Sequence, residues 1–106
     1  MVKIIGEKQP LSYFLDKEIF ITDYNYMVSK KNDGHDHYYE FQVSTVENGI
    51  IKHYKSWNSG NAIITFFDRV RDGKQKLPIK TVVRERYKKN SFYFEGYDFE
   101  YLEKEK

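Results

Sequence analysis

The sequence predicts an all-β protein that contains one helix. Two observations lead to this class. Several segments alternate apolar, β-branched or aromatic residues with polar ones, and only one segment repeats its apolar residues at helical spacing. The 106 residues, 18% of them aromatic, fit a single folded domain over residues 1–106. Within it, residues 1–16 are expected to form an N-terminal extension and residues 97–106 a C-terminal tail.

The first third of the chain indicates a short strand, a turn and a long strand. Residues 1–16 are interpreted as the short strand, followed by a turn or a single helical turn at residues 11–15. Residues 18–29 are rich in β-branched and aromatic side chains, and the run is long enough for a strand that bends or bulges partway. The polar residues 30–36 then predict a loop.

The clearest local prediction is a β-hairpin in the middle of the chain. Residues 38–45 place apolar and polar side chains alternately, as a half-buried strand does. The pair Asn48-Gly49 favours the positive φ angles of a tight hairpin turn. Residues 50–57 are therefore expected to return as a third strand.

One helix and two further strands complete the pattern. Residues 59–61 (Ser-Gly-Asn) offer an N-cap, and Gly73 fits the position just beyond a helix end. Between them, four apolar residues lie on one helical stripe: Ile63, Phe66, Phe67 and Val70. Residues 77–84 alternate as a fourth strand, a turn follows at 88–91, and residues 92–97 predict a fifth strand.

Three strands, a helix and two strands is the order found in an OB-fold. That fold is a five-stranded Greek-key barrel whose helix lies between the third and fourth strands, with an oligonucleotide-binding face across the second and third. A half-open sheet with one helix packed on it would give the same linear pattern. We expect an OB-like barrel, although a fold alone does not define a function.

Charge is distributed very unevenly along the chain. Residues 50–90 contain eleven Lys or Arg against three Asp or Glu, a local balance of +8 within a chain whose formal net charge is only +2. Aromatic residues lie in or beside this basic window, and single-stranded nucleic acid needs both cations for phosphates and rings for stacking. The alternative is a solvated, lysine-rich surface on a small domain.

Strand parity selects the candidate nucleic-acid-binding residues. Cations of one parity on a strand would line a groove, and an aromatic side chain of the same parity would stack on a base. The candidates are Lys52, Tyr54, Lys55, Trp57, Lys80, Arg84 and Arg86. Alternatively, Trp57 plugs the end of the core, and the cations snorkel from a partly buried face. The remaining stacking candidates are Tyr24, Tyr26, Tyr38 and Tyr54 itself, of which about half are expected in the core or its rim.

Three segments also carry a family resemblance: residues 17–24 (KEIFITDY), residues 54–64 (YKSWNSGNAII), and residues 77–83 (LPIKTVV) with 91–95 (SFYFE). In these segments the chain resembles small OB-fold single-stranded DNA-binding proteins of bacteriophages and mobile elements of low-GC Gram-positive bacteria. The resemblance covers about residues 15–96 and consists of patterns of residue type. It implies a non-enzymatic role in replication, recombination or repair of a mobile element, or a place as a small subunit of a dedicated polymerase or primase.

Other functions find little support in the residues. The chain has no cysteine, which fits a reducing cytoplasm, and it has no apolar segment of membrane-spanning length. No nucleophile elbow, phosphate loop or catalytic carboxylate pair is present, so neither enzymatic activity nor a cofactor is expected. A loop with two histidines and two aspartates fits no zinc signature well, so no metal site is predicted: Asp33, His35, Asp36 and His37.

Two alternatives for partners stay open. The preferred partner is single-stranded DNA, with RNA not distinguished from it. The alternative is an interaction module that binds a replication enzyme or inhibits a host protein, since a net charge of +2 is modest for a dedicated DNA binder. The acidic and aromatic tail, residues 97–106, would be an extension of the last strand, a partner-binding segment, or a chain end that folds back over the basic residues.

Overall fold

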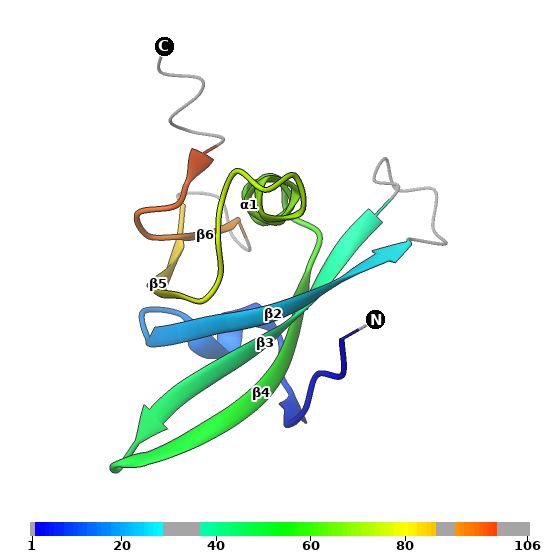
Figure 1. Cartoon of the computed structure of the whole chain (residues 1–106). Coiled ribbons are helices and arrows are strands. Elements are labelled where there is room, and N and C mark those ends of the chain that lie inside the picture. Colours follow the sequence, from blue (N-terminus) through cyan, green and yellow to red (C-terminus); the bar gives the residue numbers. More distant parts are fainter. Residues whose placement is uncertain (1, 29–36, 87–90, 100–106) are drawn as a thin grey trace.

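The computed structural model describes residues 2–28, 37–86 and 91–99 (Figure 1). Within these residues, six strands form a sheet in the order β1-β4-β3-β2-β5-β6, and one α-helix accompanies them. The elements are β1 (Glu7–Lys8), the 3-10 turn η1 (Leu11–Phe14), β2 (Glu18–Val28), β3 (His37–Glu47), β4 (Ile50–Asn58), α1 (Asn61–Arg71), β5 (Ile79–Glu85) and β6 (Phe92–Phe94). The predicted all-β class with a single helix is confirmed.

The central hairpin and the long first strand form as their sequences predict. β3 and β4 pair antiparallel around Asn48 and Gly49, whose φ angles of 53° and 77° are those of a tight Asn-Gly turn. β2 pairs with β3, and the register between them shifts between Ile21 and Asp23, which is the expected bulge. The three strands make a meander that bends around one face of the core.

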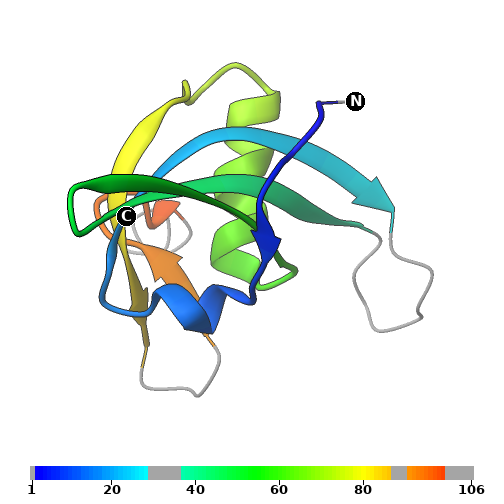
Figure 2. The ribbon, with the colours of Figure 1, turned by 90° about the horizontal axis from the view of Figure 1, so that it is seen from below.

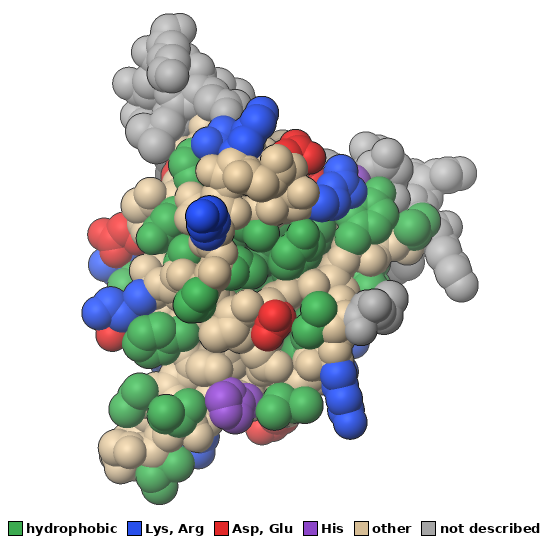
Figure 3. Space-filling model, viewed as in Figure 1, with side chains coloured by type: hydrophobic (Ala, Val, Ile, Leu, Met, Phe, Trp, Pro, Cys, Tyr) green, Lys and Arg blue, Asp and Glu red, His purple; other side chains and the backbone are tan. Residues whose placement is uncertain are grey.

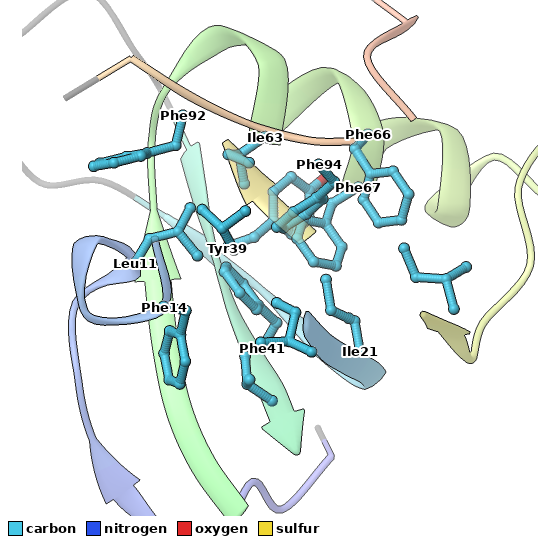
Figure 4. Packing of buried hydrophobic residues seen from close by; sticks show 14 of the residues in the cluster. Leu11, Phe14, Ile21, Tyr39, Phe41, Ile63, Phe66, Phe67, Phe92 and Phe94 are labelled. Carbon is cyan, nitrogen blue, oxygen red and sulfur yellow. The ribbon is translucent and has the colours of Figure 1, made fainter. Parts of the chain in front are cut away.

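The helix covers the inner face of this meander with its apolar stripe. Ile63, Phe66 and Phe67 are fully buried, and the α1 C-terminus is followed by Gly73 at φ 79°. The ring of Phe67 packs on Phe41 of β3 at a centroid distance of 4.9 Å. Figure 4 shows these side chains meeting those of β2, β3, β6 and η1 in one cluster. The predicted plugging of the core by the helix stripe is confirmed.

Backbone pairing leaves the sheet open. Within the described residues no ladder joins β4 to β6. The segment that precedes β2 contacts β4 at its beginning and β5 at its end instead. β1 pairs parallel to β4, the Gln9 N–H donates to the Lys55 carbonyl at 2.9 Å, and Leu15 forms a bridge with Val83 of β5. The closed five-stranded barrel therefore stays a prediction, while an open six-stranded sheet is what the structure contains.

The first described residues lie across the outer face of the meander, which is the face turned away from α1. We call residues 2–6 the N-terminal strap; it passes in front of β2 and β3 in Figure 2. The Asn25 side-chain amide accepts a hydrogen bond from the Val2 N–H at 2.8 Å and donates one to the Val2 carbonyl at 2.6 Å. Gln42 makes the same pair with Ile5, at 2.9 and 2.8 Å. Two amides thus hold the strap by its backbone.

Candidate nucleic-acid interface

Cross-strand pairing divides the predicted residues of β4 between the two faces of the sheet. Tyr54 pairs with the buried Val43, so Tyr54 and Lys52 lie on the face that is turned toward the core. Lys55 and Trp57 have the opposite parity and lie on the outer face. These four candidates therefore do not form one surface.

Tyr54 is part of the core. Only 5% of its surface is exposed, and its ring packs on Phe14 at 5.3 Å and Tyr13 at 5.5 Å between centroids. Its hydroxyl donates a hydrogen bond to Glu47 Oε2 at 2.7 Å. A ring in this position has no free face for a nucleobase, so the placement gives no support to the predicted stacking role.

Lys52 is exposed beside an acidic neighbour. The carboxylate of Glu47 accepts hydrogen bonds from the hydroxyls of Tyr54 and Thr45, and these bonds lower the pKa of Glu47, with a further contribution from Lys52. A cavity of about 270 Å³ opens next to this group, between η1 and the β3–β4 hairpin. Its lining consists of Tyr13, Phe14, Lys17, Glu18, Thr45, Val46 and Glu47. Two glutamates against one lysine give this lining a negative balance, which disfavours a phosphate there.

Trp57 and its neighbours form the most suitable contact for nucleic acid. The side chain is partly exposed on the outer face, and the Lys8 ammonium lies 4.8 Å from the centre of its ring. Lys8 is also in register with Lys55 across the β1–β4 ladder. Glu40 is opposite Trp57 on β3 and supplies one negative charge. An aromatic ring and two cations are thus brought together at the paired edge of β4.

Both arginines of β5 and its C-terminal end are paired with carboxylates. Arg84 contacts Asp16 at 2.9 Å and Glu95 at 3.2 Å, and the hydrogen bond with Asp16 is the largest cause of the raised Arg84 pKa. Arg86 forms an ion pair with Asp98, which is largely buried. The start of the acidic tail therefore does fold back on basic residues, and it neutralises part of the +8 window.

Beyond Asp98, the described part of the tail packs on the helix. Phe99 stacks parallel to Phe66, with 6.4 Å between the ring centroids and 11° between the ring planes. The Arg69 guanidinium lies 4.1 Å from the centre of the Phe99 ring. Residues 100–106 of the predicted tail lie outside the described residues.

Lys80 stands apart from the other candidates. It is exposed on β5 and pairs with Phe20 of β2, which places it on the outer face, with β2 and β3 between it and β4. On the surface shown in Figure 3, Lys and Arg side chains are scattered singly and do not gather in one patch. The basic window of the sequence is therefore distributed over several surfaces in the fold.

The histidine and aspartate loop is largely outside the described residues, including Asp33, His35 and Asp36. His37 is described, and its Nε2 atom lies 3.0 Å from Asp68 Oδ1. The same carboxylate oxygen accepts a hydrogen bond from the buried Tyr39 hydroxyl at 2.5 Å. Among the residues that the structure describes, no group of three or more His, Cys, Asp or Glu is arranged to hold a metal ion.

Sequence reasoning missed the residues that come from the N-terminal segment. Lys8 was placed in an extension, and Asn25 and Gln42 read as the polar positions of ordinary strands. Their roles depend on a parallel pairing and on backbone contacts over long sequence separations, which side-chain periodicity does not encode. The one available signal was the glycine at position 6, because glycine often marks a special backbone conformation. The structure has such a conformation there, with φ at 101°.

The described residues define a β-rich fold with one helix and with a basic and aromatic cluster at one paired sheet edge. Residues 5–95 match the family described as Domain of unknown function (DUF8468), and the chain belongs to that family. Comparison with curated proteins gave no match. Comparison with solved structures gave none either. Across the described ranges, no helix is long and apolar enough to cross a membrane.

Proposed function

We propose that this protein binds single-stranded DNA with little sequence preference, and that it acts in replication or recombination of a phage or mobile element. The observation that carries the proposal is the cluster of Trp57, Lys8 and Lys55, in which the Lys8 ammonium lies over a partly exposed indole and Lys55 is the register partner of Lys8. Base stacking on an aromatic side chain tolerates any sequence because every base has a π face. The lysines would neutralise the flanking phosphates.

The strand arrangement supports an OB-like fold for this role. β2, β3 and β4 form the meander, β5 pairs with β2, β6 pairs with β5, and α1 joins β4 to β5. This order would suit an OB-fold whose last contact, between β4 and β6, is not formed among the described residues. β1 and η1 are then additions that cover the open side.

The predicted residues would contribute unequally to DNA binding. Trp57 and Lys55 are the centre of the proposed interface, Lys8 joins them, and Lys80 would extend the path of the strand across the outer face. Lys52 is on the core-facing side of β4, so it would contact DNA only if the DNA strand passed around the edge of the sheet. Arg84 and Arg86 would contribute after they exchange their carboxylate partners for phosphates. Tyr54 has no place in the proposed interface because its ring is buried.

Fluorescence provides a direct test because Trp57 is the only tryptophan in the chain. Addition of a single-stranded oligo-dT of about 30 nucleotides should quench its emission, and anisotropy of the labelled oligonucleotide should give a salt-sensitive affinity. Trp57→Ala should weaken that affinity by about 1–3 kcal/mol. The matched control is Tyr26→Ala, which removes another exposed ring that lies under a cation, Arg71, on the core-facing side.

Two results would contradict the proposal. One is the absence of binding at low salt. The other is an equal loss of affinity in the Trp57→Ala and Tyr26→Ala variants, because that result would place the strand elsewhere. Duplex DNA of the same length should compete poorly, since its bases are not free to stack.

A second candidate is a small interaction module that binds a replication enzyme or inhibits a host protein. The specific observation in its favour is the neutralisation of Arg84 and Arg86 by Asp16, Glu95 and Asp98, which reduces the positive charge available for phosphates. A stoichiometric protein partner that co-purifies from the native host after nuclease treatment and high salt would favour this candidate.

A further inference from the structure

The tip of the β3–β4 hairpin carries an exposed apolar patch. Val46, Ile50 and Ile51 are 59%, 63% and 63% exposed. β2 pairs with β3 only as far as Ser44, so the tip extends beyond its neighbouring strand. Figure 3 shows hydrophobic side chains gathered at the lower left, where Figure 1 places the end of this hairpin. A projecting group of aliphatic side chains is typical of an interaction site.

The backbone of β4 is also unpaired at this tip. The Lys55 carbonyl points away from β3, since it accepts the Gln9 N–H. Alternate residues of a strand point the same way, so the N–H and C=O of Ile51 have this outward direction too. β1 pairs with β4 only at Tyr54 and Lys55, and no described strand lies beside Ile51. This short edge is a template for an additional strand.

We propose that a second copy of this chain pairs with this edge, antiparallel, with the two-fold axis at Ile51. The Ile51 residues of the two copies would then exchange two backbone hydrogen bonds and face each other on the outer side. Val46 is opposite Ile51 within each hairpin, so the pairing gives an apolar row of four β-branched side chains. On the other side of the sheet, Ile50 of each copy lies opposite Lys52 of the other.

The charges at the tip favour a second copy over an unrelated strand. Glu47 pairs with Ile50 in the hairpin, so it lies on the same side as Lys52 of the second copy, with Ile50 between them. Neighbouring strands are about 4.8 Å apart, which places the two backbones about 10 Å from each other, within reach of the two side chains. Each copy brings one such cation and one such anion, so the joint is neutral and self-complementary.

The contact is short, so the dimer is weak and depends on concentration. Sedimentation equilibrium of the protein without DNA, from about 10 μM to 1 mM, should show a monomer–dimer equilibrium. Ile51→Lys should raise the dissociation constant by about tenfold or more, because it places two ammonium groups face to face on the axis. The matched control is Val28→Lys, a change of the same kind at a 68% exposed position at the far end of β2, and it should have no effect.

Cross-linking tests the register independently, because the chain has no cysteine of its own. Directly opposed residues of an antiparallel pair have Cα atoms about 5.5 Å apart, which suits a disulfide. Ile51→Cys should therefore form a covalent dimer rapidly under mild oxidation, while Ile50→Cys and Val28→Cys should do so slowly.

Each contrary outcome overturns the pairing. A protein that stays monomeric at all concentrations would show that the edge is unused or accepts a strand from another protein. A dimer that survives Ile51→Lys, or equal cross-linking of the three cysteine variants, would place the contact elsewhere. Since these measurements contain no nucleic acid, they are independent of the proposed DNA binding.

Discussion

The hydroxyl of Tyr54 donates a hydrogen bond to Glu47 Oε2 at 2.7 Å and so ties the core-facing side of β4 to the end of β3. The pKa of Glu47 is lowered from its ordinary value of 4.5, first by this bond and then by the one from Thr45. A carboxylate with a lowered pKa stabilises the fold above its unfolded pKa, and this contribution is lost as the pH falls through its folded value.

Removing that hydroxyl should therefore change the pH dependence of stability. Tyr54→Phe should be less stable than wild type at neutral pH, and the difference in unfolding free energy should shrink as the pH falls from about 5 to 3. Urea unfolding at a series of pH values measures this, and NMR titration should show the Glu47 pKa rising toward 4.5. Tyr24→Phe is the control, and a pH-independent difference for Tyr54→Phe would contradict the prediction.

Truncation of the helix side chain at the centre of the core should be severe. Phe67 is fully buried, with ring centroids 4.9 Å from both Phe41 and Phe66. Phe67→Ala should lower the free energy of unfolding by about 3–5 kcal/mol, because it removes buried surface and leaves a cavity. Chemical denaturation provides the measurement. Phe20→Ala, on the outer face, should cost clearly less, and equal costs would show that the core is not centred on the helix.

A methyl group at Gly6 should detach the N-terminal segment. Its φ is 101°, and a Cβ atom there would lie 2.1 Å from the His53 carbonyl oxygen. Gly6→Ala should therefore open the β1–β4 ladder and speed hydrogen exchange of the Gln9 amide. Gly73→Ala is the control, because it has the same left-handed strain at φ 79° but open space around the added atom. Unchanged Gln9 exchange in Gly6→Ala would show that the ladder is not held there.

Neutralising a carboxylate beside Arg84 should reveal whether that arginine contacts DNA. Glu95 contacts Arg84 at 3.2 Å and is more than half exposed, so Glu95→Gln should leave the fold intact. If Arg84 is in the interface, the affinity for oligo-dT should rise about two- to fivefold at low salt, with less gain at high salt. Glu18→Gln serves as the control, because it neutralises an exposed glutamate elsewhere on the sheet. Equal affinities for all three proteins would remove Arg84 from the interface.

The elements of the fold that depend on local residue patterns were predictable. The Asn48-Gly49 turn, the bulge in β2 and the apolar stripe of α1 each have a signal within a few residues. The 3-10 turn at Leu11–Phe14 also lies within the predicted turn at residues 11–15. Local geometry and burial agree at these places, so periodicity was sufficient.

The candidate site was predictable only in part. Parity placed Lys55 and Trp57 on one face of β4, but it could not show that Tyr54 is covered by η1 or that Lys8 reaches the indole. Those contacts depend on the path of residues 7–16, which no short-range pattern sets. The ion pairs of Arg84 likewise join residues 68 and 11 positions apart in the sequence. The net charge of residues 50–90 therefore overestimated the positive charge of the candidate interface.

The attachment of the N-terminal strap has a consequence for evolution. Asn25 and Gln42 each bond a peptide group, so the grip does not depend on which side chains Val2 and Ile5 carry. Substitutions can accumulate at these two positions while the strap keeps its place, whereas Gly6 and the buried Ile4 are constrained. Descendants of this chain can diverge at positions 2 and 5, and the lasting trace of the strap would be Gly6 and the two amides beneath it.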